Sequence, residues 1–386
     1  MEAEVLSKQK FENPLMFVKC AGDIGFAVVD VETEQLVKHI GHGEYPHKAT
    51  FHPNGKWAYL SFIVHSTIEV IDTKTLETVY VEKNMPKGSV GVNLSRDGRY
   101  LFVGSYGQIP GEGFPGISIF DTNFGETPEL KLIKTIPIGR CGGVVVDSKN
   151  DLWVALTDAN KVIRINGQPP FNVKQEIQVG AHPHDLVFCK ELQILQVNHA
   201  DEKYVTFLDT LNNEVIGHVP TGDNPHGGKF VISDEAIVCV VPSRKENVVS
   251  FIDIKKVLAN RTSTGLMEDA LIAQVDIGTP QGFVDATKDN RYAILDAYKA
   301  THVTIIDLQT YKIVKRVEVG DKPMHPQITH DGMKCFVDSM EEGTISVLDI
   351  KPLYEGNPDG VYVRTKLEDV GIQPSGNFFS YRMYLL

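Results

Sequence analysis

Three histidines occupy the same position in a phrase that recurs along the sequence. His47, His184 and His226 each follow a proline directly, and each comes four residues after a glycine. A fourth, His325 in KPMHPQITH, lies one residue out of register with them. Imidazoles that enter one site together can ligate a metal, hold a haem iron axially, or act as acid and base near neutral pH. The alternative is that each ring only packs against, or hydrogen-bonds to, a neighbouring strand.

Three cations fall near the same position in the repeat. Lys87 lies in MPKGSV, Arg140 lies in IGRCGG, and Arg244 follows a predicted hairpin. Basic groups there could pair with the carboxylates of a ligand, and arginine could do so in a bidentate fashion. The alternative is that each is a solvated surface charge.

A repeat in the sequence must position these residues. A short apolar run, an Asp and often a Thr recur eight times, with one copy ending in Asn, at intervals of 42 to 54 residues. The copies centre on Asp30, Asp72, Asp121, Asn166, Asp209, Asp253, Asp307 and Asp349. A period in the forties with strand patterning is typical of one four-stranded propeller blade. We therefore predict an all-β fold, an eight-bladed β-propeller of four-stranded blades. We expect the repeated Asp to cap a turn through backbone N–H groups.

The spacing also predicts how the blades begin, end and close. Asn54-Gly55, Asp97-Gly98 and Asp331-Gly332 are dipeptides typical of type I′ hairpins. The copy at Asp30 lacks most of the strands that precede the other copies, and residues 370–386 resemble those missing strands. We therefore expect the two ends of the chain to share the first blade. The blades would then form a single domain spanning residues 1–386.

Two segments interrupt the regular pattern. Residues 254–270 are the best candidate for a short helix or a long loop. Residues 104–118 form a Gly/Pro-rich insertion that is either a lid or a surface loop. In a propeller the loops that enter the first strand of each blade share one rim, so residues at the same phase of the repeat are expected to gather there.

Composition excludes several function classes. The net charge is −12 and no Lys/Arg-rich run occurs, which argues against a nucleic-acid partner. No apolar run approaches the about 18 residues that a membrane helix needs, and we see no secretion signal. The five cysteines form no Cys-x-x-Cys pair, which favours reduced thiols. We expect a cytoplasmic location, although a processed periplasmic form would have the same features.

Three stretches give the chain a family resemblance. CAGDIGFAVVDVETEQLVKHI, YPHKATFHPNGKWAYL and the tail QPSGNFFSYRM resemble the haem d1-binding eight-bladed propellers. This family includes the d1 domain of cytochrome cd1 nitrite reductase and the haem d1 biosynthesis protein NirF. The resemblance implies a ligand that is haem d1 or a related tetrapyrrole.

The resemblance also implies roles for the residues. His47 would be the axial iron ligand, and His184 and His226, 42 residues apart, would be the two distal histidines that donate protons to a bound anion or to the macrocycle. Lys87, Arg140, Arg244 and His325 would help to bind the cofactor. Because the sequence has no Cys-x-x-Cys-His motif for a c-type haem, it favours either a NirF-like role in haem d1 biosynthesis or a d1-type nitrite reductase domain served by a separate electron-donor protein.

Two other functions remain open from the residues alone. One is a lyase-like enzyme with a divalent metal ion at the rim histidines, as in virginiamycin B lyase-like propellers; Glu44 is the only acid close to one of these histidines. The other is a non-catalytic binding propeller of the YVTN type. The sequence does not decide whether the protein is an enzyme; if it is, an oxidoreductase or a tetrapyrrole-modifying enzyme is expected.

Overall fold

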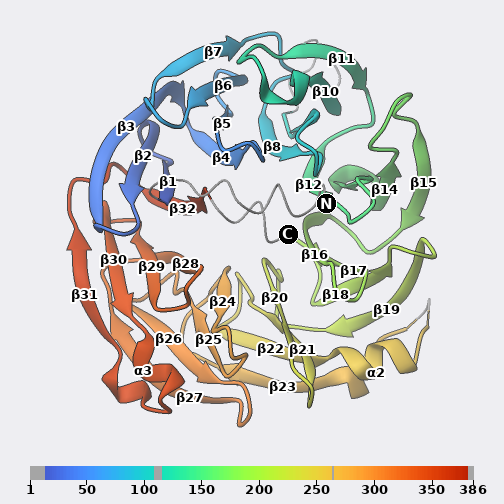
Figure 1. The fold of residues 1–386 in the computed structure, drawn as a ribbon. Coiled ribbons are helices and arrows are strands. Elements are labelled where there is room, and N and C mark those ends of the chain that lie inside the picture. The colour runs from blue at the N-terminus through green and yellow to red at the C-terminus, as the bar shows by residue number, and fades with distance from the viewer. Residues whose placement is uncertain (1–13, 108–114, 263–264, 381–386) are drawn as a thin grey trace. The chain divides into compact units, whose positions relative to one another are not determined.

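In the part of the chain that the structure describes, eight four-stranded antiparallel sheets account for almost all the regular structure (Figure 1). The computed structural model describes residues 14–107, 115–262 and 265–380. The sheets divide between two compact units. The predicted fold class, an eight-bladed β-propeller of four-stranded blades, is confirmed, and the single domain spanning residues 1–386 stays a prediction.

The first unit comprises residues 1–159, 163–174 and 370–386 and holds the first four sheets, the last of them in large part. In order across each sheet, the strands are β3 (Gln35–Glu44), β2 (Ile24–Asp30), β1 (Leu15–Cys20) and β32 (Pro374–Phe379); β4 (Pro46–Phe51), β5 (Trp57–Phe62), β6 (Thr67–Asp72) and β7 (Thr78–Glu82); β8 (Ser89–Leu94), β9 (Tyr100–Ser105), β10 (Ile117–Asp121) and β11 (Lys131–Ile136); and β12 (Cys141–Val146), β13 (Leu152–Leu156), β14 (Lys161–Ile165) and β15 (Val173–Gln178).

The second unit comprises residues 160–162 and 175–369 and holds the other four sheets. Their strands, again in order, are β16 (Pro183–Cys189), β17 (Ile194–His199), β18 (Tyr204–Asp209) and β19 (Glu214–Pro220); β20 (Lys229–Ile232), β21 (Ile237–Val241), β22 (Val248–Asp253) and β23 (Leu271–Asp276); β24 (Val284–Ala286), β25 (Tyr292–Leu295), β26 (His302–Asp307) and β27 (Lys312–Glu318); and β28 (Pro323–Ile328), β29 (Lys334–Ser339), β30 (Thr344–Asp349) and β31 (Tyr362–Leu367).

Two short α-helices, and the 3-10 turns Glu268–Ala270 and Pro358–Gly360, accompany the strands in the described residues of the second unit. Helix α2 (Ile254–Ala259) lies in the segment predicted to be a helix or a long loop, and α3 (Lys351–Tyr354) follows β30. In the described part of the chain, no helix has the length and apolar character needed to cross a membrane. All five cysteines are buried and unbonded to one another, as expected for reduced thiols.

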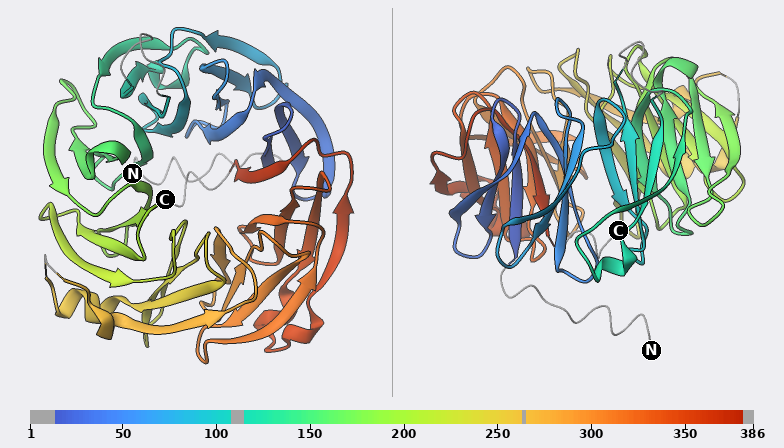
Figure 2. Two further views of the ribbon diagram at one scale, coloured as in Figure 1. Left: turned by 180° about the vertical axis from the view of Figure 1, so that it is seen from behind. Right: turned by 90° about the horizontal axis from the view of Figure 1, so that it is seen from above.

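The C-terminal strand completes the first sheet, as the sequence predicts. Strand β32 pairs with β1, with Phe17 opposite Phe378, and the left view of Figure 2 draws the red C-terminal strand beside the dark-blue N-terminal strands. The Ser380 N–H donates to the Leu15 carbonyl at 2.9 Å, which fastens the two ends of the chain. The remaining tail residues 381–386, and residues 108–114 of the Gly/Pro-rich insertion, lie outside the described residues.

The repeated Asp caps the turn between the third and fourth strands of the blades. Asp72 Oδ1 accepts the N–H groups of Lys74 at 2.9 Å and Thr75 at 3.0 Å, and the carboxylates at the equivalent positions accept N–H groups in the same way. In the degenerate copy, Asn166 Oδ1 accepts the Gln168 N–H at 3.2 Å. The prediction of a repeated Asx-type turn is therefore confirmed.

Removing one such cap should have a modest effect on stability. We expect Asp72→Ala to lower the free energy of unfolding by about 1 kcal/mol, because two N–H groups lose their acceptor. Urea unfolding followed by circular dichroism measures this, with Asp72→Asn as the matched control that keeps an acceptor oxygen. Equal losses in the two variants would contradict the capping role.

The hairpins predicted from Asn-Gly and Asp-Gly are present, but their turns are not of type I′. That type needs a positive φ at both central residues, whereas only the glycine has one: φ is +73° at Gly55 and +76° at Gly98, and neither Asn54 nor Asp97 is in the left-handed region. The reason is local. Asn54 Oδ1 accepts the Lys56 N–H at 2.9 Å, so the Asn54 side chain helps to close this turn. In a type I′ turn, backbone hydrogen bonds alone would close it.

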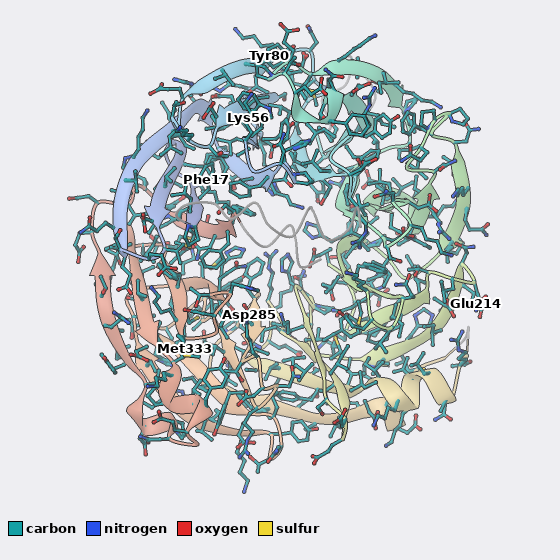
Figure 3. All side chains as sticks on the ribbon, viewed as in Figure 1. Phe17, Lys56, Tyr80, Glu214, Asp285 and Met333 are labelled. Carbon is teal, nitrogen blue, oxygen red and sulfur yellow. The ribbon has the colours of Figure 1, made fainter. Side chains whose placement is uncertain are left out.

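Apolar faces of neighbouring sheets pack together within each unit. In the first unit Phe17 of β1, labelled in Figure 3, meets Phe51 of β4 edge to face with ring centroids 4.9 Å apart. In the second unit Phe207 of β18 and Phe230 of β20 meet in the same way at 6.3 Å. This packing fixes the first strands of successive sheets, from whose starts the candidate site residues project.

Candidate functional site

A β-bulge recurs at the start of the first strand of several sheets, at the phase that the histidines share in the sequence. The register shifts between Pro46 and Lys48 on β4 and between Pro183 and Asp185 on β16, so the extra residues are His47 and His184. On β28 the shift falls between Met324 and Gln327, around His325. Bulges re-aim side chains and are common beside functional sites. The phase therefore corresponds to a physical feature of the strand.

His47 is oriented by the neighbouring sheet of the first unit. Its Nδ1 lies 2.7 Å from the carbonyl oxygen of Val90 on β8. Because a carbonyl can only accept, Nδ1 carries the hydrogen, and in the neutral ring the lone pair lies on Nε2. Histidines that bind metals are held in this way, with the second ring nitrogen donating to a carbonyl.

The other predicted cations of the first unit differ in their surroundings. Lys87 is exposed in the loop before β8. Arg140 donates from Nη2 to Asp158 Oδ1 at 2.5 Å, and its guanidinium lies 4.7 Å from the centre of the Tyr106 ring. A ligand carboxylate would therefore have to displace Asp158 from Arg140.

Two of the predicted histidines meet in the second unit. The rings of His184 and His226 have centroids 5.8 Å apart and are tilted by 47°. His226 lies in the loop before β20, and its Nδ1 is 3.2 Å from the Gly282 carbonyl oxygen, so its Nε2 also carries the lone pair. Burial, followed by the nearby Arg244 charge, lowers the pKa of His226 to about 3. This imidazole is neutral at physiological pH.

A carboxylate lies beside this histidine pair. Asp185 Oδ2 accepts the Gly227 N–H at 2.9 Å and the Asn198 side-chain amide at 3.2 Å. Burial alone would raise the pKa of Asp185, but the positive charge that His226 and His184 carry in acid, the Gly227 N–H and the Arg244 charge outweigh it, and the pKa lies below its ordinary value. Asp185 is therefore ionised at neutral pH.

Phe283 connects the predicted residues of the second unit. Its ring meets His226 edge to face at 4.9 Å between centroids and stacks on His325 at 3.4 Å. The Arg244 guanidinium lies 5.7 Å from the same ring. His184, through His226, belongs to the same cluster. The structure thus brings together four predicted residues, all in the second unit.

Arg244 is the cation best placed to receive an anionic ligand. Its Nε donates to the Tyr298 hydroxyl at 3.0 Å. Among the described residues, no carboxylate lies within ion-pairing distance of its guanidinium. Its terminal N–H groups therefore suit a carboxylate brought by a ligand.

Four residues of this site, Phe283, Asp185, Tyr298 and Asp296, were not predicted from the sequence. Phe283 follows Gln281 and Gly282, which occupy the same phase of the repeat as the histidines, and that spacing is the signal that could have found it. Asp185 directly follows His184, so the expectation that Glu44 is the only acid close to one of these histidines is wrong. Asp285, labelled in Figure 3, lies two residues beyond Phe283 and accepts the Ile328 N–H at 3.0 Å, which ties β24 to β28.

The described residues offer no group of three His, Cys, Asp or Glu side chains that could hold a metal ion together. The divalent-metal alternative therefore finds no support in the ligand set. A single axial histidine on a haem iron needs no such group, because the macrocycle supplies the other nitrogens.

Comparisons with solved structures support the fold. The dihydro-haem d1 dehydrogenase NirN, solved in complex with DHE, is 20% identical with a TM-score of 0.79, covering 97% of this chain and 77% of that one. A protein of unknown function from Desulfotomaculum acetoxidans is 14% identical with a TM-score of 0.56, covering 79% of this chain and 95% of that one. Hydrazine synthase from Kuenenia stuttgartiensis is 15% identical with a TM-score of 0.54, covering 77% and 90%.

Sequence comparisons identify the family. No curated protein sequence matches this chain at a significant level. The family model described as the cytochrome D1 heme domain matches residues 12–383, nearly the whole sequence, as the resemblance of the opening, the His47 stretch and the tail predicts. The chain therefore belongs to the cytochrome d1 haem-domain family.

Proposed function

We propose that this protein binds haem d1 or a closely related tetrapyrrole and modifies the macrocycle in haem d1 biosynthesis. The observation that carries the proposal is the state of His226: a buried, neutral imidazole with its hydrogen on Nδ1 and its lone pair on Nε2. With its hydrogen held on Nδ1, the ring presents only an acceptor at Nε2, so it can take up a proton there but has none to donate. This suits the removal of hydrogen from a bound macrocycle.

Each unit, taken by itself, carries residues that suit a d1-type ligand. His47, with Nδ1 donating to the Val90 carbonyl, would hold the iron through Nε2. Arg244, with terminal N–H groups directed to no carboxylate of the described chain, would bind a carboxylate of the tetrapyrrole. The ligand, when bound, supplies the redox-active macrocycle, and the protein supplies orientation and proton acceptors.

The reaction class must balance its electrons. Converting a carbon–carbon single bond of the macrocycle into a double bond releases two protons and two electrons. His226 would accept one proton through Nε2 and the second would pass to solvent, while the two electrons need a separate acceptor, either a redox protein or a small oxidant. NirN is described as a dehydrogenase of dihydro-haem d1, and the proposal extends that reaction class to this chain.

Turnover of dihydro-haem d1 tests the proposal. With ferricyanide as electron acceptor, the purified protein should convert it to haem d1, observed as a shift in the visible spectrum and the loss of two hydrogen masses. His226→Gln should bind the tetrapyrrole but convert it at least about 100-fold more slowly, because a general base is lost. His65→Gln, an exposed position, serves as the control. No conversion by the unaltered protein, or an unchanged rate in His226→Gln, would contradict the proposal.

Nitrite reduction is a second candidate, favoured by the pairing of two histidine rings. His184 and His226, 5.8 Å apart, form the kind of pair that could bind a small anion. In this case a separate electron-donor protein would supply the electrons. Protein loaded with haem d1 and given a chemical reductant and nitrite would then produce nitric oxide. Nitric oxide formation without conversion of dihydro-haem d1 would favour this candidate over the first.

A further inference from the structure

One peptide group lies between His226 and a buried carboxylate. The Gly282 carbonyl oxygen is 3.2 Å from His226 Nδ1. The Phe283 N–H, the other end of the same peptide group, donates to Asp296 Oδ1 at 3.1 Å. The Gly282 N–H donates to that same oxygen at 2.9 Å. Asp296 is thus linked to His226 through a single amide.

The segment between them is closely held. A Cβ at Gly282 would lie 1.9 Å from the Tyr298 hydroxyl oxygen, so only glycine fits there. Asp296 directly follows β25 and its side chain is fully buried. Within the described residues its Oδ2 has no hydrogen-bond partner. An unpartnered buried carboxylate oxygen costs folding free energy, so a role beyond stability is worth seeking.

Hydrogen bonds in a chain polarise one another. Negative charge at Asp296 draws the Phe283 N–H toward it, which makes the Gly282 carbonyl a stronger acceptor. A stronger acceptor favours the imidazole tautomer with hydrogen on Nδ1. The lone pair then remains on Nε2.

We propose that Asp296 is a positioning residue that acts through the Gly282–Phe283 peptide to hold His226 in the tautomer with its hydrogen on Nδ1. Only the use of the resulting Nε2 lone pair rests on the proposed function. The tautomer itself is a property of the protein without ligand.

Several charged groups surround this link. His226 faces Asp185, Arg244 and His184, and Asp296 faces Arg244 and Tyr298. His325 lies on the far side of the Phe283 ring. Burial raises the pKa of Asp296 to about 7, so its charge appears as the pH rises through neutrality. The hold on the His226 tautomer should strengthen over the same range.

Nitrogen NMR of the free protein tests the link without any tetrapyrrole. Histidine is labelled with ¹⁵N, and the His226 signals are assigned by their loss in His226→Gln. At pH 8.5 the unaltered protein should show one tautomer, with hydrogen on Nδ1. In Asp296→Asn, which keeps an acceptor oxygen but loses the charge, the population with hydrogen on Nε2 should rise at least fivefold. Asp289→Asn removes the same charge from an exposed turn of the same blade and should change nothing.

A second measurement tests the proposal even if the Asp296→Asn variant does not fold. In the unaltered protein the His226 ¹⁵N shifts should move between pH 6 and 8.5, far above the pKa of the imidazole itself. Constant shifts over this range, or an Asp296→Asn variant with the tautomer of the unaltered protein, would overturn the proposal. If the tautomer does not respond while His226→Gln still abolishes turnover, the positioning role fails and the proposed function stands. If the tautomer responds in a protein without turnover, the positioning role stands and the proposed function fails.

Discussion

His47→Ala will bind a d1-type tetrapyrrole at least about 100-fold more weakly than the unaltered protein, because it loses the imidazole that we expect to ligate the iron. Removing only the partner that orients a metal-binding histidine costs about 10- to 100-fold in metal affinity, so removal of the histidine itself should cost at least as much. The hydrogen bond from Nδ1 to the Val90 carbonyl gives His47 this metal-binding orientation. Titration of the protein with haem d1, followed in the Soret region, measures the affinity.

Chemical rescue separates loss of the ligand from loss of the fold. In His47→Gly, added imidazole should restore the axial spectrum and part of the affinity, because it can occupy the space of the missing ring. His65→Ala removes an imidazole from an exposed loop of the same unit and should bind as the unaltered protein does. Equal affinity in His47→Ala and the unaltered protein would show that His47 does not ligate the iron.

The second large effect is a loss of stability in acid that depends on His226. Burial lowers the pKa of His226 to about 3 in the folded protein, whereas an unfolded histidine titrates near its ordinary value of about 6.5. Between these two values unfolding takes up one proton, so the free energy of unfolding falls as the pH falls, by about 1.4 kcal/mol per pH unit. Above about pH 6.5 the neutral His226 contributes its full stabilisation. By pH 4 the free energy of unfolding should have fallen by about 3 kcal/mol through this group.

A comparison of variants isolates this histidine. His199, whose pKa burial lowers to about 4, contributes in the same direction. Asp296, whose pKa burial raises to about 7 from an unfolded value of about 3.9, contributes in the opposite direction over the whole of this range. The slope of stability against pH in urea unfolding should therefore be compared between the unaltered protein and His226→Gln. Between pH 4 and 6, unfolding of His226→Gln should take up about one proton fewer than unfolding of the unaltered protein. Unfolding of His65→Gln, a change at an exposed position, should take up as many protons as unfolding of the unaltered protein. Identical slopes in all three proteins would contradict a buried, neutral His226.

The fold could be predicted because its determinants are local and recur eight times. Each repeated Asp caps its turn through N–H groups two or three residues away, as Asp72 does, so the signal survives in sequence. The same local reasoning gave the wrong turn type at Asn54-Gly55, because a hydrogen bond from the Lys56 N–H to the Asn54 side chain replaces part of the backbone geometry.

The site could be predicted in part, for a related reason. His47 and His184 share a phase because each lies at a bulge that recurs at the start of a first strand, and His325, one residue out of register, also lies at such a bulge. Phe283 and Asp296 could not be predicted as site residues, because their contacts are made between segments that are far apart in the sequence. The repeat in the sequence carries no signal of such contacts. The neutral state of His226 likewise follows from burial, which the sequence does not give.

The central claim is that this member of the cytochrome d1 haem-domain family binds a d1-type tetrapyrrole through His47. The most direct test is titration of the purified protein, freed of pigment, with haem d1, followed by absorption and resonance Raman spectroscopy. We predict saturable binding of one tetrapyrrole per chain, with an iron–histidine signal that disappears in His47→Ala and returns with imidazole in His47→Gly. Absence of saturable binding by the unaltered protein, or an iron–histidine signal that persists in His47→Ala, would contradict the account.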